Sequence, residues 1–333
     1  KFNPAPLNSN MPLEEITIAQ ALKEKGYSTF FAGKWHLGES EEYYPQNRGF
    51  DVNVGGHSRG GPYTGKKYFG PFKNPQMQIE SPEGDHLPDR LARDTATFIK
   101  KHREEPFLAY LSFYSVHTPL DGRPDLVEKY EAKRKSLGLE PEYEPEHPRK
   151  NLTVQQHAVY GAMVEAMDEA IGKVLKAIDD NGLREDTIVV FFSDNGGPPT
   201  YGAWNRQVAG SKFTLWEGGI RIPFILSRPN DPNAGETWDQ VVSTLDVAPT
   251  VLRAAGIALP KGLDGRPIVK SNVTRDLFWR LDKSHAVRSG DWKLLHNGGK
   301  KRGPTSGIVN REKYLTGTRL FNLREDISET RDM

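Results

Sequence analysis

The sequence predicts an α/β fold in which helices sandwich a mostly parallel sheet, followed by a smaller antiparallel β subdomain. Two observations lead to this fold class. Up to about residue 265, segments with helical spacing of apolar residues alternate with short apolar runs, as in parallel sheets covered by helices. Beyond it, short strand-like runs follow one another without a long helical segment. We therefore expect an α/β domain over residues 1–265 and a small C-terminal α+β subdomain over residues 266–333.

Two helix–strand pairs are predicted first. Apolar residues at helical spacing indicate a helix over residues 11–25, ended by Gly26, and then a buried strand over 27–32. A second helix is expected over 89–102. The strand after it, 107–113, is apolar almost throughout, which is typical of a strand covered on both faces.

The middle of the chain is expected to contain an exposed segment, followed by further helices and strands of the α/β domain. Residues 119–151 are rich in charge and proline, so they indicate an exposed excursion. A long helix over 153–180 follows, and the apolar run 187–192 predicts the strongest strand of the chain. A further strand is predicted over 222–226 and a helix over 246–255.

Short strands dominate the C-terminal part of the chain. The runs 285–288 and 292–295 flank the turn-forming residues Ser289-Gly290-Asp291, and so predict a β-hairpin. Residues 320–323 predict a further strand.

The composition of the 333 residues excludes several classes of function. A net charge of +1 gives no basis for binding nucleic acid. No apolar run approaches the ~20 residues that a membrane-spanning helix needs. The chain has no cysteine, so it contains no disulfide, zinc–thiolate site or thiol nucleophile. No signal peptide is visible in the polar, proline-rich residues 1–6.

Side chains suited to anion chemistry follow three of the predicted strands. Lys34 and His36 come after the first strand, His117 after the second, and Asp194 and Asn195 after the strongest one. Active sites of parallel α/β sheets gather at the carboxyl ends of the strands. We therefore expect these five residues to lie close together.

Asp194 and Asn195 are candidate metal ligands. Their carboxylate and amide oxygens are the hard ligands that Ca²⁺ and Mg²⁺ prefer. Two ligands are too few for a metal site, so the others must come from elsewhere. In isolation, Asp-Asn-Gly-Gly is more often a simple turn.

Four side chains are candidates for holding and protonating an oxyanion. Lys34 and His36 share a face if residues 33–37 are extended. Lys212 is a compact positive charge suited to a sulfate or phosphate oxygen. His117 precedes Thr118-Pro119, which favours extended backbone, and an ordinary histidine pKa near ~6.5 suits general acid catalysis. The alternative for each of them is a solvated side chain without a role.

Candidate substrate-binding residues lie on two glycine-containing loops. They are His57, Arg59, Trp204 and Arg206, of which the aromatic one is suited to stacking on a sugar ring. The alternative is that both loops have no function.

Four segments, in this order and spacing, resemble the type I sulfatases of the alkaline phosphatase superfamily. They are Gly33-Lys34-Trp35-His36-Leu37-Gly38, Val116-His117-Thr118-Pro119, Ser193-Asp194-Asn195-Gly196-Gly197, and Lys212 with Glu217-Gly218-Gly219-Ile220-Arg221-Ile222-Pro223. The segments 17–22, 245–250, 263–267 and 288–295 match as well, so the resemblance covers nearly the whole chain.

The resemblance implies an alkaline phosphatase-like fold and hydrolysis of sulfate esters at a single Ca²⁺ in a periplasmic or secreted enzyme. It implies that Asp194 and Asn195 are calcium ligands and that Lys34 and Lys212 hold sulfate oxygens. It further implies that His36 assists breakdown of a sulfated intermediate and that His117 protonates the leaving alcohol. The expected substrate is a sulfated carbohydrate or an aryl sulfate.

The nucleophile that the resemblance implies is a formylglycine, made from Cys or Ser in a Cys/Ser-x-Pro/Ala-x-Arg signature. Family order places this signature, and paired aspartates of the calcium site, ahead of Lys1. We therefore expect the 333-residue chain alone to be inactive, with an incomplete calcium site, unless a separate N-terminal segment or chain completes it. The alternatives are a non-catalytic sulfatase-like protein that binds sulfated glycans and, less favoured, a phosphoesterase of the same superfamily.

Overall fold

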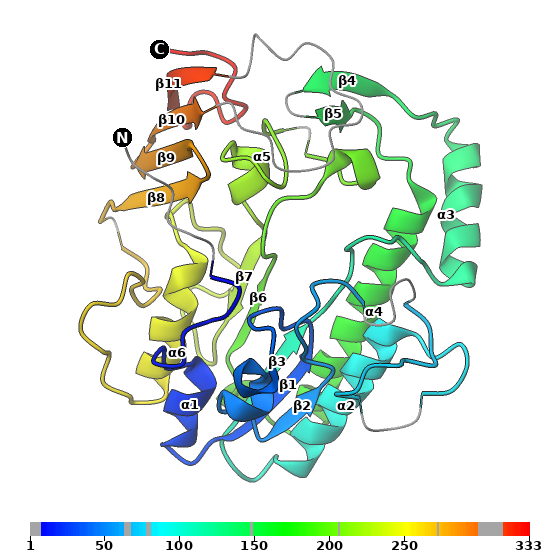
Figure 1. The fold of residues 1–333 in the computed structure, drawn as a ribbon, viewed down its shortest axis with the longest axis vertical. Helices are drawn as coiled ribbons and strands as arrows, with labels where there is room; N and C mark the ends of the chain where they lie inside the picture. The colour runs from blue at the N-terminus through cyan, green and yellow to red at the C-terminus, as the bar shows by residue number, and fades with distance from the viewer. Residues whose placement is uncertain are drawn as a thin grey trace.

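A three-stranded parallel sheet forms the centre of the large domain. The computed structural model describes residues 8–62, 68–77, 81–146, 149–205, 207–271, 273–298 and 316–333. In the sheet, β1 (Ser28–Gly33) lies between β2 (Val52–Val54) and β3 (Phe107–Ser112) (Figure 1). Both pairings are parallel, so the three strands end at the same edge of the sheet.

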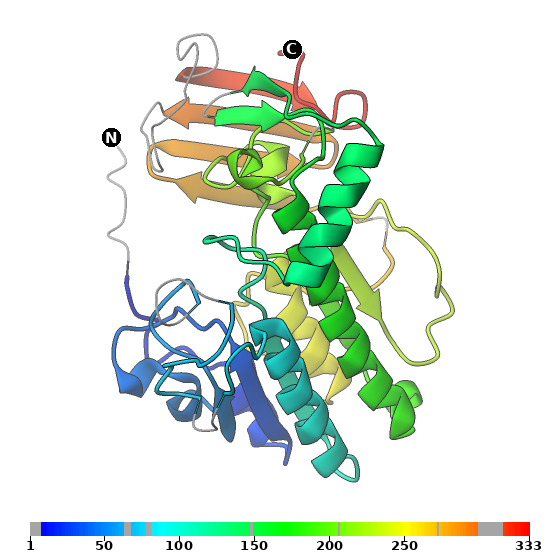
Figure 2. The ribbon, with the colours of Figure 1, turned by 90° about the vertical axis from the view of Figure 1, so that its right-hand side faces the viewer.

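Helices cover both faces of this sheet, because side chains of β1 alternate between two apolar clusters. Phe30 packs with buried side chains of α2 (Leu87–Lys101), whereas Phe31 packs with Ala19 of α1 (Ile18–Lys23). On the first face, α2 packs along α4 (Ala158–Asp180), and α4 in turn packs along α3 (Pro124–Ser136) (Figure 2). On the second face, α1 contacts α6 (Val247–Ala254). The predicted sandwich of helices around a parallel sheet is confirmed.

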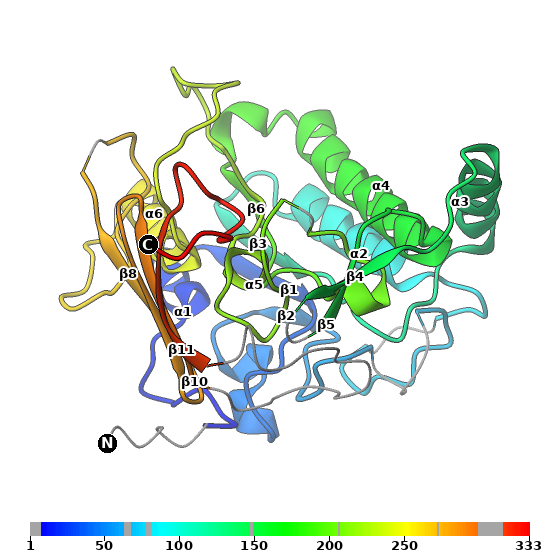
Figure 3. The same ribbon diagram turned by 90° about the horizontal axis from the view of Figure 1, so that it is seen from above.

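A second pair of strands lies on the β3 side of the sheet. β6 (Val189–Phe192), seen near β3 in Figure 3, pairs in antiparallel orientation with β7 (Phe224–Ser227) (Figure 1). Among the described residues, β3 pairs only with β1 and β6 pairs only with β7. Side chains of β3 pack on both faces, Ala109 and Leu111 against the first cluster and Leu108 against the second, although its residues are only half buried and Tyr110 is 38% exposed.

The C-terminal residues form a four-stranded antiparallel sheet at one end of the molecule (Figure 2). Its strands are β8 (Asp276–Leu281), β9 (Ser284–Ser289), β10 (Trp292–Gly298) and β11 (Thr316–Asn322), in the spatial order β11–β10–β9–β8. The predicted hairpin is β9–β10, and Gly290 in its turn has φ 56°. A buried apolar cluster of this sheet includes Leu215 and Trp216, which precede the short helix α5 (Glu217–Ile220).

Two predicted helices begin later than their apolar spacing suggested. α1 starts at Ile18 because Thr17 and Gln20 form a reciprocal capping box, which leaves Leu13 and Ile16 exposed at 50% and 72%. α4 starts at Ala158, where the ring of His157 accepts a hydrogen bond from Tyr160 N. In both cases side-chain capping, rather than periodicity, sets the first helical residue.

The predicted exposed excursion contains regular structure. It includes α3 and the hairpin of β4 (Tyr143–Glu146) with β5 (Arg149–Leu152). Short 3₁₀ helices complete the described elements: Glu41–Tyr43, Pro45–Asn47, Arg184–Asp186, Pro199–Tyr201 and Thr244–Asp246. No helix in the described ranges is both long and apolar enough to cross a membrane.

Candidate functional site

Four charged or titratable groups come together beyond the ends of β1, β3 and β6. Lys34 follows β1, His117 follows β3, Asp194 follows β6, and Lys212 lies in the turn before α5. Lys34 interacts electrostatically with Asp194 and Lys212, and His117 interacts with all three of them. Segments that are far apart in the sequence therefore form one site with two ammonium groups, one imidazole and one carboxylate.

The site lowers the pKa of both Lys34 and His117. For Lys34 the main cause is burial, with Lys212 adding to it and Asp194 opposing it. For His117 the main cause is again burial, to which the positive charges of Lys212 and Lys34 add. Both groups thus lie where an additional negative charge would be stabilised, which is the electrostatic condition for an anion-binding site.

The tautomer of His117 is fixed by its own loop. Its ring Nδ1 lies 2.8 Å from the carbonyl oxygen of Thr118. A carbonyl oxygen only accepts, so Nδ1 donates the hydrogen bond. Nε2 is therefore the ring atom that takes up or releases a proton.

A buried tyrosine that the sequence analysis did not identify holds the His117 loop. The hydroxyl of Tyr68 lies 2.8 Å from Tyr114 O and 2.9 Å from His117 O. The backbone N–H of Tyr68 donates to Asp121 Oδ2 at 3.2 Å. Tyr68 is fully buried, so these bonds fix the loop from its inner side.

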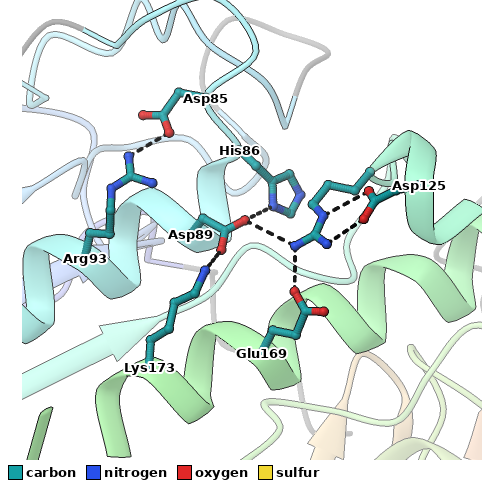
Figure 4. Close-up of polar contacts among 8 residues, drawn as sticks. Asp85, His86, Asp89, Arg93, Asp125, Glu169 and Lys173 are labelled. Atoms are coloured by element: carbon teal, nitrogen blue, oxygen red, sulfur yellow. Dashed lines mark hydrogen bonds and ion pairs between the residues drawn. The ribbon is translucent and has the colours of Figure 1, made fainter. Parts of the chain in front are cut away.

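A network of charged side chains anchors the end of the same loop to the helices (Figure 4). The guanidinium of Arg123, the N-cap of α3, contacts Glu169 at 2.6 Å and Asp89 at 3.8 Å. Asp89 also binds His86 Nδ1 at 2.9 Å and the ammonium of Lys173. The network joins α2, α3 and α4, so the segment between β3 and α3 is held at both ends.

The loop after β6 is shaped by close backbone packing. Asn195 Nδ2 donates to Asp194 Oδ1 at 2.9 Å, and Gly196 N donates to Gly219 O at 3.0 Å. A Cβ atom at Gly196 would lie 1.8 Å from the carbonyl oxygen of Gly218. Glycine is therefore required there, because α5 packs directly on the loop.

Asp194 and Asn195 do not by themselves hold a calcium ion. Ca²⁺ takes 6–8 oxygen ligands, and the two residues are only part of such a set. In the described part of the chain, no group of three or more His, Cys, Asp or Glu residues is arranged to hold a metal.

The turn that carries Lys212 is held by Asn205, which the sequence analysis also missed. Its side-chain amide donates to Gly197 O at 2.8 Å, and to Gly210 O and Gly218 O at 3.3 Å. This one amide joins the Asp194 loop, the Lys212 turn and α5. A hydrogen bond from a side chain to distant backbone leaves no local sequence pattern.

His36 lies on a neighbouring loop rather than on an extended strand. Its φ of 61° and the φ of 103° at Gly33 show that residues 33–37 are not extended, so Lys34 and His36 do not share a face by the period-two argument. His36 N donates to His57 O at 3.0 Å, and Gly60 lies against the His36 ring.

The candidate substrate-binding residues that the structure describes lie on two loops: His57 and Arg59 on one, and Trp204 on the loop after β6. His57 Nε2 lies 3.3 Å from the hydroxyl of Tyr44, and its pKa is lowered by burial and by the charge of Arg59. Trp204 is 46% exposed on the loop after β6. Arg206 lies outside the described residues.

One segment of the chain matches the letters of the nucleophile signature, but its serine has a structural role. Ser284-His285-Ala286-Val287-Arg288 has the letters Ser-x-Ala-x-Arg. Ser284 lies in β9 of the C-terminal sheet, where its hydroxyl donates to Asn297 Oδ1 and accepts from Gly298 N. Its hydroxyl is thus occupied in pairing β9 with β10.

Comparisons with known proteins identify the family of the chain. The sulfatase family model matches residues 1–257. The chain is 29% identical to human steryl-sulfatase over 79% of this chain and 55% of that protein. It is 30% identical to a sulfatase of Formosa agariphila over 98% of this chain and 68% of that protein, and 32% identical to an ulvan-active sulfatase of the same organism over 78% and 50%.

Solved structures show the same fold. The crystal structure of Ps i-CgsB has a TM-score of 0.75 and 26% identity, covering 98% of this chain and 72% of that one. The chain spans about half to two thirds of the length of the curated relatives named above. With most of its length matched by the family model, the chain belongs to the sulfatase family.

Proposed function

We propose that this chain forms the anion-binding part of a sulfatase that hydrolyses sulfate esters of a carbohydrate. The observation that carries the proposal is the convergence of Lys34, Lys212, His117 and Asp194 at the strand ends. The names of the relatives support the substrate class, since one is an ulvan-active sulfatase and Ps i-CgsB was solved in complex with k-i-k-neocarrahexaose. Such a substrate points to a periplasmic or secreted enzyme.

The two lysines would bind the sulfate group. Their ammonium groups lie close enough that the charge of Lys212 helps to lower the pKa of Lys34. An anionic sulfate between them would remove this repulsion and add charge-assisted hydrogen bonds. Negative charge that grows on the sulfate oxygens during the reaction would be stabilised by the same groups.

His117 would supply the proton for the leaving alcohol. With Nδ1 donating to Thr118 O, only Nε2 can transfer a proton. A bound sulfate ester would offset the positive charges of Lys34 and Lys212, which help to lower the pKa of His117 in the free chain. Substrate binding would thus favour the protonated imidazole. His36, on the neighbouring loop, is proposed to assist the breakdown of the sulfated intermediate.

The nucleophile and most of the metal ligands would come from outside these 333 residues. Asp194 and Asn195 would contribute two ligands to Ca²⁺, which when bound neutralises charge on the sulfate. The nucleophile expected for the family is a formylglycine. We propose that the 333-residue chain alone does not turn over sulfate esters.

The edges of two strands support the proposal that another segment completes the site. Among the described residues, β3 and β6 each have one edge without a partner strand, and each leads into a site residue. Unpaired N–H and C=O groups on a strand edge are a template for a further strand. A strand placed there would end among Lys34, His117 and Asp194.

Calorimetry tests the binding part of the proposal. The full chain is titrated with a sulfated carrageenan oligosaccharide and with its desulfated form. We expect binding only of the sulfated form, weakened about tenfold by Lys212→Ala through the loss of one charge-assisted contact. Lys176→Ala, which removes a surface ammonium paired with Asp180 on α4, is the matched control. Equal affinity for both sugars would contradict the proposal.

A turnover assay separates the enzyme from the alternative, a non-catalytic protein that binds sulfated glycans. The absence of a nucleophile among the described site residues favours this second candidate as long as no other segment joins the chain. Turnover of an aryl sulfate by the purified chain would refute the proposed inactivity. Turnover that appears only when a nucleophile-bearing segment is supplied supports the enzyme, and its absence in that case supports the binding protein.

A further inference from the structure

A cluster of charged side chains is buried between the C-terminal sheet and α5. Lys293 of β10 is 0% exposed, Glu217 at the start of α5 is 2% exposed, and Glu329 of the C-terminal segment is 4% exposed. None of the three belongs to the anion site described above.

One ammonium group serves two carboxylates in this cluster. Lys293 Nζ donates to Glu217 Oε1 at 2.9 Å and lies 2.7 Å from Glu329 Oε1. The second contact is a short ion pair to a buried carboxylate oxygen. The other oxygen of Glu329 accepts from the backbone N–H of Glu217 at 2.7 Å. Arg221 and Arg288 lie 3.7 and 3.9 Å from Glu217 Oε2.

Burying such a cluster is not the usual way to gain stability. Removing both charges of an ion pair from water is costly, and apolar replacements of similar volume are often neutral or stabilising. The adjacent apolar cluster, in which Trp216 packs on Phe321 at 5.5 Å, already attaches this loop to the sheet. The ion pairs also fix how Glu217 is oriented relative to the sheet, because hydrogen bonds are directional and apolar contacts are not.

Gly218 and Gly219, which follow Glu217 in α5, contact the backbone of both loops of the anion site. Gly218 N donates to Ala209 O at 2.7 Å, and a Cβ atom at Gly218 would lie 2.4 Å from Gly210 O, in the turn that carries Lys212. Gly219 O accepts from Gly196 N in the loop that carries Asp194. These contacts leave no room for Gly218 and Gly219 to shift without moving both loops.

We propose that Lys293, acting through Glu217 and supported by Glu329, is a positioning residue that fixes Lys212 and Asp194 relative to each other. The C-terminal sheet thus helps to hold the residues of the anion site in place. The inference rests on the proposed function for the identity of the anion, but not for the geometry of the loops.

The test compares Lys293→Met with a control that weakens the same sheet elsewhere. Leu277→Ala removes a buried side chain of β8, two strands away from Lys293 in the same sheet. Two readouts are measured: amide hydrogen exchange at Gly196 and Gly218 without ligand, and calorimetric affinity for the sulfated oligosaccharide. For Lys293→Met we expect both exchange rates to rise and affinity to fall about tenfold. For Leu277→Ala we expect a lower melting temperature with both readouts unchanged.

A double variant keeps the test decisive if Lys293→Met does not fold. Glu217→Gln/Lys293→Met removes the ammonium together with one of its two carboxylates. The remaining carboxyl, Glu329, can stay protonated because burial raises its pKa. We therefore expect this variant to fold while still showing faster exchange and weaker binding. Wild-type exchange and affinity in this variant would overturn the inference. If the wild-type chain binds no sulfated ligand, the proposed function fails, and the exchange rates alone decide whether Lys293 positions the loops.

Discussion

At the residue scale, the site depends on groups that change each other's protonation. His117 carries the proton in the proposed reaction, and its surroundings set when that proton is available. Burial and the charges of Lys212 and Lys34 lower its pKa, while Asp194 and the Thr118 carbonyl oppose the shift. In the free chain at neutral pH, the imidazole is therefore mostly neutral.

This arrangement predicts how His117 titrates. We expect an NMR titration of the imidazole in the free chain to give a midpoint below the ordinary histidine pKa of 6.5. The midpoint should rise in Lys212→Ala, because a neighbouring positive charge is removed, and should rise again when inorganic sulfate binds. Lys176→Ala on α4 should leave it unchanged. A midpoint at or above the ordinary value, insensitive to Lys212, would show that the two side chains are not neighbours.

Patterns in the sequence predicted the titratable residues of the site, but they did not predict the buried residues that hold the loops of the site in place. Lys34, His117 and Asp194 were predictable because each follows an apolar strand, and strand ends of a parallel sheet meet at one edge. Tyr68 and Asn205 were not predictable, because their partners are backbone carbonyls of distant segments. The assumption that residues 33–37 are extended is wrong because Gly33 and His36 both have positive φ.

At the element scale, buried helices and strands were the most predictable parts of the fold. α2, β1 and β3 were expected within about two residues of their ends, since long apolar periodicities are reliable signals. α3 was missed because its sequence is strongly charged and only Leu126 on it is buried. Its position depends on contacts with α4 that a local pattern does not reveal: the packing of Leu126 on small side chains of α4 and ion pairs such as Arg123 with Glu169.

The packing of α5 against the β6 loop gives a second prediction. Gly196→Ala would place a methyl group against the Gly218 carbonyl, and overpacking of this kind typically costs about 1–3 kcal/mol. Gly172→Ala in α4 is the matched control, because no atom lies within 4 Å of its Cβ position. Alanine in a helix is expected to stabilise by about 0.5–1 kcal/mol. Urea unfolding of both variants checks this, and equal free energies of unfolding would argue against the close approach.

At the scale of the whole molecule, the C-terminal sheet and the large domain share a buried charge cluster. Burial raises the pKa of Glu329 from 4.5 to about 7, against the opposing effects of Lys293 and the Glu217 N–H. The folded chain therefore binds this proton more tightly than the unfolded chain does. The resulting stabilisation is complete below the unfolded pKa of 4.5 and is lost as the pH rises through about 7.

Glu329→Gln should remove this part of the pH dependence. Between about pH 5 and about pH 8, we expect the free energy of unfolding of the variant to fall less than that of the wild type. The expected difference is on the order of 1–3 kcal/mol. Glu236→Gln, at a surface carboxylate paired with Lys270, serves as the control. Urea unfolding curves at both pH values provide the measurement, and parallel behaviour of wild type and Glu329→Gln would rule out the raised pKa.

We propose above all that Lys34, beyond the end of β1, and Lys212, in the turn before α5, bind the sulfate group of a carbohydrate ester. A crystal structure of the chain with a sulfated carrageenan oligosaccharide tests it most directly. We expect a sulfate group between the two ammonium groups, with the bridging ester oxygen facing Nε2 of His117. A sugar bound with its sulfate away from both lysines would contradict the account.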